Sequence, residues 1–126
     1  MLDVIQISYH EPYADDNFEL LQLFAPHAKR VQGVEGIFNA HKAAAELAET
    51  RNFYVIDADA IIDEKFDFNF TPSPSKEQWP GVYETECVFV WRSQNPVNDL
   101  LYGYGGAKLF PRKALIEAKD WKVDMT

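Results

Sequence analysis

Apolar and polar positions in the first half of the chain follow two different periodicities. Residues 2–8 and 53–57 are short β-branched and aromatic runs of the kind that form buried strands, and residues 28–32 are a third, shorter candidate. Apolar residues recur at helical spacing after Asp15 and over residues 37–50. The pattern predicts the order strand, helix, strand, helix, strand.

The two predicted helices are marked differently in the sequence. Asp15 or Asp16 can cap the first helix, and Pro26 ends it. Its apolar face is expected to hold Phe18, Leu21 and Phe24. The second helix lacks glycine and proline, and its apolar face is expected to hold Ala40, Ala43, Ala44, Leu47 and Ala48. His41, next to Lys42, is expected on the solvated face of that helix.

This alternation predicts an α/β fold, because strands joined by helical crossovers lie parallel in one sheet. Ligands of such sheets bind beyond the carboxyl ends of the strands. Three loops are therefore expected to converge at one edge of the sheet: residues 8–16, 33–39 and 57–63.

The second half of the chain does not continue the alternation of strands and helices. Phe66, Phe68 and Phe70 alternate with polar residues, which predicts a half-buried strand whose phenylalanines are core residues. A proline- and serine-bearing surface loop (71–81) and a strand over residues 86–92 follow. Residues 102–106 are expected to form a flexible aromatic loop, and a last helix is expected from Pro111 to Ala118. Trp91 is expected to pack in the core, whereas Trp79 lies in the proline-bearing loop and can be exposed.

Size and charge restrict the possible functions. The chain has 126 residues, which is one domain, and its hydrophobic fraction of 47% is sufficient for a core. The net charge of -8 disfavours non-specific binding to nucleic acid or to anionic membranes. No apolar run reaches the length of a membrane span, and the first residues lack the features of a signal peptide. The single cysteine, Cys87, is expected in the core of a cytoplasmic protein.

Two aspartates end the third predicted strand. Asp57 and Asp59 are one residue apart and follow a buried run. Carboxylates at the ligand-binding edge of a sheet can hold a hard divalent cation against a diphosphate, because Mg²⁺ and Mn²⁺ prefer oxygen ligands. The alternative is that these aspartates only form a turn or cap a helix.

Residues 36–42, Gly-Ile-Phe-Asn-Ala-His-Lys, followed by an alanine-rich helix and by residues 54–59, Tyr-Val-Ile-Asp-Ala-Asp, resemble the nucleotide-binding half of GT-A glycosyltransferases. The resemblance covers residues 2–62. It implies a three-layer α/β/α sandwich of reduced size with a mostly parallel sheet. It also implies that residues 63–126 form the acceptor-side half.

The resemblance further implies metal-dependent transfer of a sugar from a nucleotide sugar to an unknown acceptor, with Mn²⁺ or Mg²⁺ held by Asp57 and Asp59. The implied nucleotide-binding residues are Ser8, Tyr9, Glu11, Asn39, Lys42 and Asp57. The implied acceptor-binding residues are Trp91, Asn95, Tyr104, Gly105 and Gly106. A catalytic base is to be sought among Asp99, Glu86 and Glu84, of which we select Asp99 and Glu86.

The chain departs from this family in length, which is about half that of complete enzymes, and in having no histidine after the Asp-x-Asp motif. Two alternatives therefore stay open. One is a non-catalytic nucleotide-sugar-binding module that contacts a partner through Tyr102–Tyr104. The other is a haloacid-dehalogenase-type phosphotransferase with Asp57 as nucleophile and Asp59 as acid/base. A homodimer is a further possibility, since an exposed sheet edge permits one.

Overall fold

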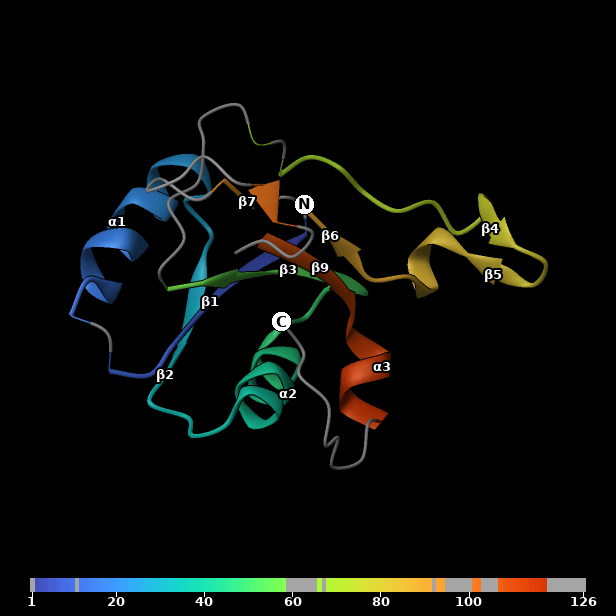
Figure 1. The fold of residues 1–126 in the computed structure, drawn as a ribbon. Helices are drawn as coiled ribbons and strands as arrows, with labels where there is room; N and C mark the ends of the chain where they lie inside the picture. The colour runs from blue at the N-terminus through green and yellow to red at the C-terminus, as the bar shows by residue number, and fades with distance from the viewer. Residues whose placement is uncertain are drawn as a thin grey trace.

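The computed structural model describes residues 2–10, 12–58, 66, 68–91, 93–94, 101–102 and 107–117. Within these residues the chain forms a mixed five-stranded sheet with helices on both of its faces (Figure 1). The strand order is β2-β1-β3-β9-β6. These strands span Asp3–Ser8 (β1), Lys29–Gln32 (β2), Asn52–Asp57 (β3), Phe89–Val90 (β6) and Ala107–Pro111 (β9).

The first three strands form the parallel part of the sheet. Ile5 of β1 is in register with Lys29 of β2 on one side and with Val55 of β3 on the other. Helix α1 (Ala14–Phe24) connects β1 to β2, and helix α2 (Ile37–Leu47) connects β2 to β3. The predicted order of strand, helix, strand, helix, strand is confirmed, and so is the α/β class.

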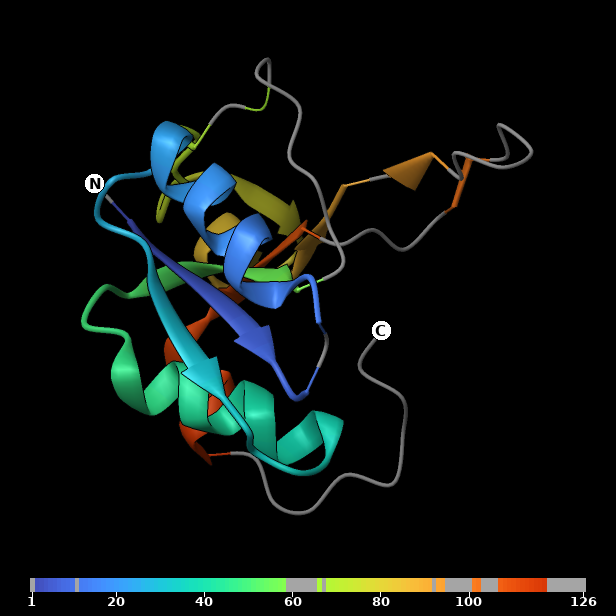
Figure 2. The same ribbon diagram turned by 90° about the vertical axis from the view of Figure 1, so that its left-hand side faces the viewer.

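The core is split between the two faces of the sheet because side chains alternate along each strand. Val4, Tyr54 and Leu109 pack with Leu21 and Ala25 under α1. Ile5, Phe53, Val55 and Phe110 face the other way, toward α2 and a third helix, α3 (Arg112–Glu117). Figure 2 shows α1 on one side of the sheet and α2 on the opposite side, so the elements form three layers.

Strand β9 was not predicted from the sequence, although it lies inside the sheet, between β3 and β6. It pairs antiparallel with β3, where Val55 lies opposite Lys108, and antiparallel with β6 on its other edge. All five of its residues are buried, including Lys108 at 2% exposure. The sheet is therefore mixed, and β6 points in the same direction as β3.

Both predicted helices start or end differently from the sequence expectation. Helix α1 begins at Ala14, so Asp15 and Asp16 lie inside its first turn and do not cap it. Leu21 is buried as predicted, but Phe24 is exposed. Helix α2 ends at Leu47, which is also exposed. Its inner face is made of Ala40, His41, Ala44 and Ala45.

The second half of the chain contains less regular structure than predicted. Residues 68–69 form a turn where the sequence predicted a strand, although Phe68 is buried as expected. The predicted surface loop contains β4 (Glu77–Trp79), which pairs with β5 (Val82–Tyr83) and exposes Trp79. A 3₁₀ turn, η1 (Glu84–Glu86), takes the start of the strand predicted over 86–92, which is reduced to β6. A short pair, β7 (Ser93–Gln94) with β8 (Leu101–Tyr102), completes the elements that the structure describes.

Two expectations drawn from the composition concern membrane-spanning segments and the burial of Cys87. Within the described ranges, no helix has both the length and the apolar character that a bilayer crossing needs. Cys87 is half-buried rather than a core residue, and its Sγ lies 3.5 Å from the carbonyl oxygen of Tyr83.

Candidate functional site

A cavity of about 360 Å³ opens where β1 and β3 end and α2 begins. It lies at the small end of the size range of ligand pockets. All three loops that the sequence analysis expected to converge contribute to it. Its lining residues are Ile7, Ser8, Tyr9, Tyr13, Val34, Gly36, Ile37, Ala40, His41, Asp57 and Ala58. The predicted convergence is thus confirmed for the described parts of these loops.

The position of this cavity follows from the strand order. Helix α1, on one face of the sheet, connects β1 to its neighbour β2. Helix α2, on the other face, connects β2 to β3, which lies on the opposite side of β1. At such a reversal of strand order the connections diverge to opposite faces and leave a crevice at the carboxyl ends of the strands. The fold therefore creates the cavity between β1 and β3.

The end of β1 supplies a hydroxyl group and two aromatic rings. Ser8 is buried, and its Oγ has no hydrogen-bond partner among the described residues. Tyr9 and Tyr13 are both more than 40% exposed, at 45% and 43%. The ring of Tyr9 lies 4.0 Å from that of His10. Glu11, a predicted nucleotide-binding residue, lies outside the described residues.

The end of β3 supplies the first of the two predicted metal-binding aspartates. Asp57 lines the cavity, as does the buried Ala58 that follows it. The amide of Ala58 donates to the carbonyl of Ile7 at 3.1 Å, and its carbonyl accepts from Nδ2 of Asn17 at 2.7 Å. Asp59 lies outside the described residues, and the residues that are described contain no group of three or more acidic, histidine or cysteine side chains able to hold a metal ion.

The start of α2 forms the opposite wall of the cavity. The helix N-cap is Gly36, with φ 90° and no side-chain cap, so the first-turn amides receive no side-chain acceptor. Asn39 and Lys42, both predicted to contact a nucleotide, do not line the cavity. Asn39 Nδ2 donates to the carbonyl of Glu35, and Lys42 Nζ lies 5.9 Å from the centre of the Phe38 ring.

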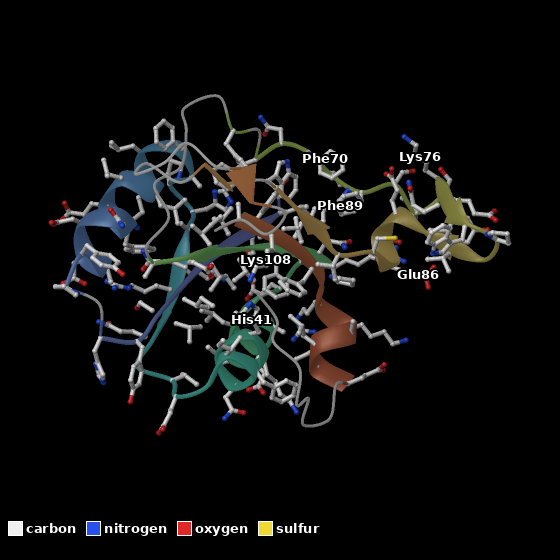
Figure 3. The ribbon with its side chains drawn as sticks, in the orientation of Figure 1. His41, Phe70, Lys76, Glu86, Phe89 and Lys108 are labelled. Atoms are coloured by element: carbon white, nitrogen blue, oxygen red, sulfur yellow. The ribbon has the colours of Figure 1, made fainter. Side chains whose placement is uncertain are left out.

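His41 contradicts the expectation of a solvated position, because it is 0% exposed and faces the sheet (Figure 3). Its Nδ1 lies 2.8 Å from the carbonyl oxygen of Ile37, and its ring meets Phe110 edge-on at 5.3 Å. Nε2 has no hydrogen-bond partner among the described residues. Burial, and to a smaller extent the charge of Lys108, lowers the pKa of His41 below its usual value of 6.5, against the effect of the bond to Ile37. Helical periodicity could not identify this residue, since a histidine has no strong preference for either face.

The predicted acceptor-side and catalytic residues are not gathered at this cavity where the structure describes them. Trp91 is half-buried and packs against Tyr54, Phe66 and Phe89. Glu86 is exposed in η1, where its Oε1 accepts from the amide of Tyr83 at 3.1 Å, and Figure 3 places it well away from His41. Asn95, Asp99, Tyr104, Gly105 and Gly106 lie outside the described residues.

The carboxylate of Glu84, the third candidate base, is occupied by contacts within its own segment of the chain. Its carboxylate accepts hydrogen bonds from the amide of Ser73 and from Nε2 of Gln78, and it lies 3.5 Å from Lys76 Nζ. It therefore holds together the segment that carries β4 and β5.

A scan against protein-family models and searches of curated proteins and of solved structures found no match to this chain.

Proposed function

We propose that the cavity binds a nucleoside diphosphate sugar and that the protein transfers the sugar to an acceptor with the help of Mg²⁺ or Mn²⁺. One observation carries the proposal. The amino end of α2 and the carboxylate-bearing end of β3 line the same cavity, at the reversal of strand order between β1 and β3. This arrangement offers one wall suited to an anion and another suited to a cation.

The phosphates would lie against the first turn of α2. Unpaired amides and the aligned peptide dipoles of a helix start attract anions. Gly36 supports this reading because it contributes no side chain between these amides and the cavity. A local attraction of this kind is required in a chain whose net charge is -8.

The cation would be held by Asp57 together with Asp59. The oxygen donors that line the cavity, the carboxylate of Asp57 and the hydroxyl of Ser8, suit a hard ion such as Mg²⁺ or Mn²⁺. When bound, such an ion acts as a Lewis acid that offsets charge on the departing diphosphate. Asp57 would orient it from the end of β3.

The nucleoside would lie at the open side of the cavity. Tyr9 and Tyr13 expose aromatic rings there, and aromatic faces stack on bases. The hydroxyl of Ser8 supplies a hydrogen-bonding group beside them. A sugar joined to the second phosphate would then extend out of the cavity, toward the acceptor.

One observation favours a second candidate, a binding module without transferase activity. Among the described residues, Asp57 is the only carboxylate that lines the cavity, and Glu86 lies elsewhere. An inverting transfer needs a base at the acceptor hydroxyl. Under this alternative the protein binds nucleotide sugars and leaves them intact.

The decisive experiment measures thermal stabilisation by UDP, GDP and their glucose and mannose conjugates, with and without Mn²⁺. Stabilisation that requires Mn²⁺ and is lost in Asp57→Asn but kept in Asp16→Asn supports the binding site. Asp16 is a suitable control because it is exposed on the first turn of α1. Transfer or hydrolysis of the bound sugar then separates the enzyme from the binding module. Indifference to every nucleotide would overturn the proposal, and hydrolysis of p-nitrophenyl phosphate would favour a phosphotransferase instead.

A further inference from the structure

Helix α1 presents three large apolar side chains to solvent. Leu20, Leu23 and Phe24 are 42%, 74% and 41% exposed, whereas Leu21 beside them is 2% exposed in the core. Their spacing of three and four residues places the three exposed side chains on one face of the helix. We call them the apolar face of α1. In Figure 2, where α1 lies in front of the sheet, no other described helix or strand covers its outer side.

The apolar face is not part of the core. The helix already buries Ala14 and Leu21, and Leu21 packs with Val4 and Tyr54 of the sheet. A single exposed apolar side chain is ordinary on a protein surface, whereas a group of adjoining ones is typical of an interaction site. The apolar face therefore needs an explanation that the packing of the sheet does not supply.

Acidic groups adjoin the apolar face. Helix α1 contains three acidic residues and no basic residue. Asp16 precedes Leu20 by one helical turn, and Glu19 precedes Leu23 by one turn, so both carboxylates lie next to the apolar side chains. Both are exposed, and neither forms an ion pair with another described residue. An occupant of the apolar face therefore meets negative charge at its margin.

The carboxyl end of the helix adds to this negative potential. The last turn, which carries Leu23 and Phe24, has no basic side chain. The carbonyl groups and the aligned peptide dipoles of a helix end attract positive charge. The salt bridge between Asp15 and Arg30 lies at the other end of the helix. An occupant with cationic flanks is therefore favoured by charge complementarity.

We propose that the apolar face of α1 binds an amphipathic helix of a partner protein, whose apolar stripe is flanked by lysine and arginine. Side chains three and four residues apart form ridges that pack into the grooves of a second helix. The 11 residues of α1 extend over about 16 Å, which accommodates about three turns of such a helix. Leu20, Leu23 and Phe24 do not line the cavity, so the inference is independent of the proposed function.

Two other occupants are disfavoured by charge. A two-fold contact between copies of this chain would use the same face twice and would bring Asp16 and Glu19 of both copies around it. Like charges oppose such a contact. An anionic membrane is opposed by the same carboxylates and by the net charge of -8.

A synthetic peptide tests the proposal. The probe is a helical peptide of about 18 leucine and lysine residues, with leucine at every third or fourth position. A scrambled peptide of the same composition has the same charge but no apolar stripe. In fluorescence anisotropy, the protein should bind the amphipathic peptide at least about tenfold more tightly than the scrambled one. Equal binding of the two peptides would show that only net charge is sensed, and either that result or no binding would overturn the proposal.

Variants locate the contact. Leu23→Ser should weaken binding of the amphipathic peptide by about tenfold, and Glu19→Gln should weaken it by about threefold. Both side chains are exposed, so both variants should keep the thermal stability of the wild type. The matched controls are Leu47→Ser and Glu46→Gln, which are exposed on α2 at the opposite face of the sheet and should bind as the wild type does. Equal losses in the controls and in the α1 variants would contradict the proposal.

Three further measurements distinguish the occupants. Self-association in sedimentation equilibrium that is lost in Leu23→Ser would assign the face to a second copy and overturn the proposal. Binding to phosphatidylcholine vesicles that is lost in the same variant would assign it to lipid, with the same consequence. In NMR titrations with the amphipathic peptide, the amide resonances of residues 20–24 should shift, and those of Ser8 and Gly36 at the cavity should not. The reverse pattern would overturn the proposal.

Discussion

Nδ2 of Asn17 donates a hydrogen bond of 2.7 Å to the carbonyl oxygen of Ala58. The bond joins the first helix to the residue that lies between the two predicted metal-binding aspartates. The amide of Ala58 is also held, by the carbonyl of Ile7. Because the amide and the carbonyl of Ala58 are both held, the backbone just after Asp57 is fixed by α1 and β1.

Replacing Asn17 by alanine should therefore lower both the stability of the fold and the affinity of the cavity for nucleotide. The buried carbonyl of Ala58 loses its partner, which should lower the free energy of unfolding by about 1–2 kcal/mol. Mn²⁺-dependent binding of UDP should weaken by about tenfold if the carboxylates shift. Titration calorimetry and urea denaturation measure the two effects. The matched control is Gln22→Ala, which removes an exposed amide side chain from the same helix. Equal losses in the two variants would contradict the prediction.

Gly36 and Gly33 offer a matched pair for testing the helix start. Both have positive φ, 90° and 77°, so alanine at either position should be destabilising by about 1–3 kcal/mol. Only Gly36 lines the cavity. Gly36→Ala should therefore also weaken nucleotide binding, whereas Gly33→Ala should leave the dissociation constant unchanged. Equal affinities in the two variants would show that the amide end of α2 does not hold the phosphates.

The buried His41 predicts a specific dependence of stability on pH. Its pKa in the folded protein is lowered from 6.5, so the unfolded chain binds a proton more readily. Above pH 6.5 both states are neutral at this residue, and stability does not depend on it. As the pH falls below 6.5, the free energy of unfolding should decrease by up to about 1.4 kcal/mol per pH unit until the folded protein takes up the proton.

The contribution of His41 is isolated by comparing the wild type with His41→Leu. In urea denaturation between pH 5 and 7, the free energy of unfolding of the wild type should fall relative to that of His41→Leu as the pH is lowered below 6.5, because only the wild type contains this proton-binding site. Curves that stay parallel would mean that His41 is not kept neutral by the fold.

Glu84 predicts a local loss of structure. Its carboxylate bonds to the amide of Ser73 and the side chain of Gln78, and glutamine at this position would put an NH₂ group against one of these donors. We expect Glu84→Gln to destabilise the β4–β5 segment by about 1–3 kcal/mol. Amide exchange at Ser73 should accelerate, and the same exchange measured in Glu77→Gln, whose carboxylate is exposed, should change little.

The sequence was informative wherever periodicity was strong. The runs ending at Ser8 and Asp57 were identified as strands because β-branched and aromatic residues are concentrated there. Their parallel pairing and the convergence of the three loops followed from the alternation with helices. These features predicted that Ser8, Tyr9 and Asp57 lie at one edge of the sheet, and all three line the cavity found there.

The sequence was uninformative where tertiary contacts decide a residue's environment. Lys108 sits in the middle of β9, and a charged residue between glycines and a proline does not indicate a buried central strand. Yet pairing with β3 and β6 covers it on both edges. His41 was misplaced for a related reason, since residues of the sheet that are distant in sequence, among them Phe110, pack against its ring. Both residues lie on the α2 side of the sheet.

The late position of β9 in the chain has a consequence for synthesis on the ribosome. Phe53 of β3 is made more than fifty residues before Phe110, its partner across the strand pair. During that interval the nascent chain exposes the apolar edge of β3, which can pair with other chains. We therefore expect premature termination before Ala107 to yield a product that aggregates or is degraded, and we expect productive folding to await the emergence of β9 from the exit tunnel.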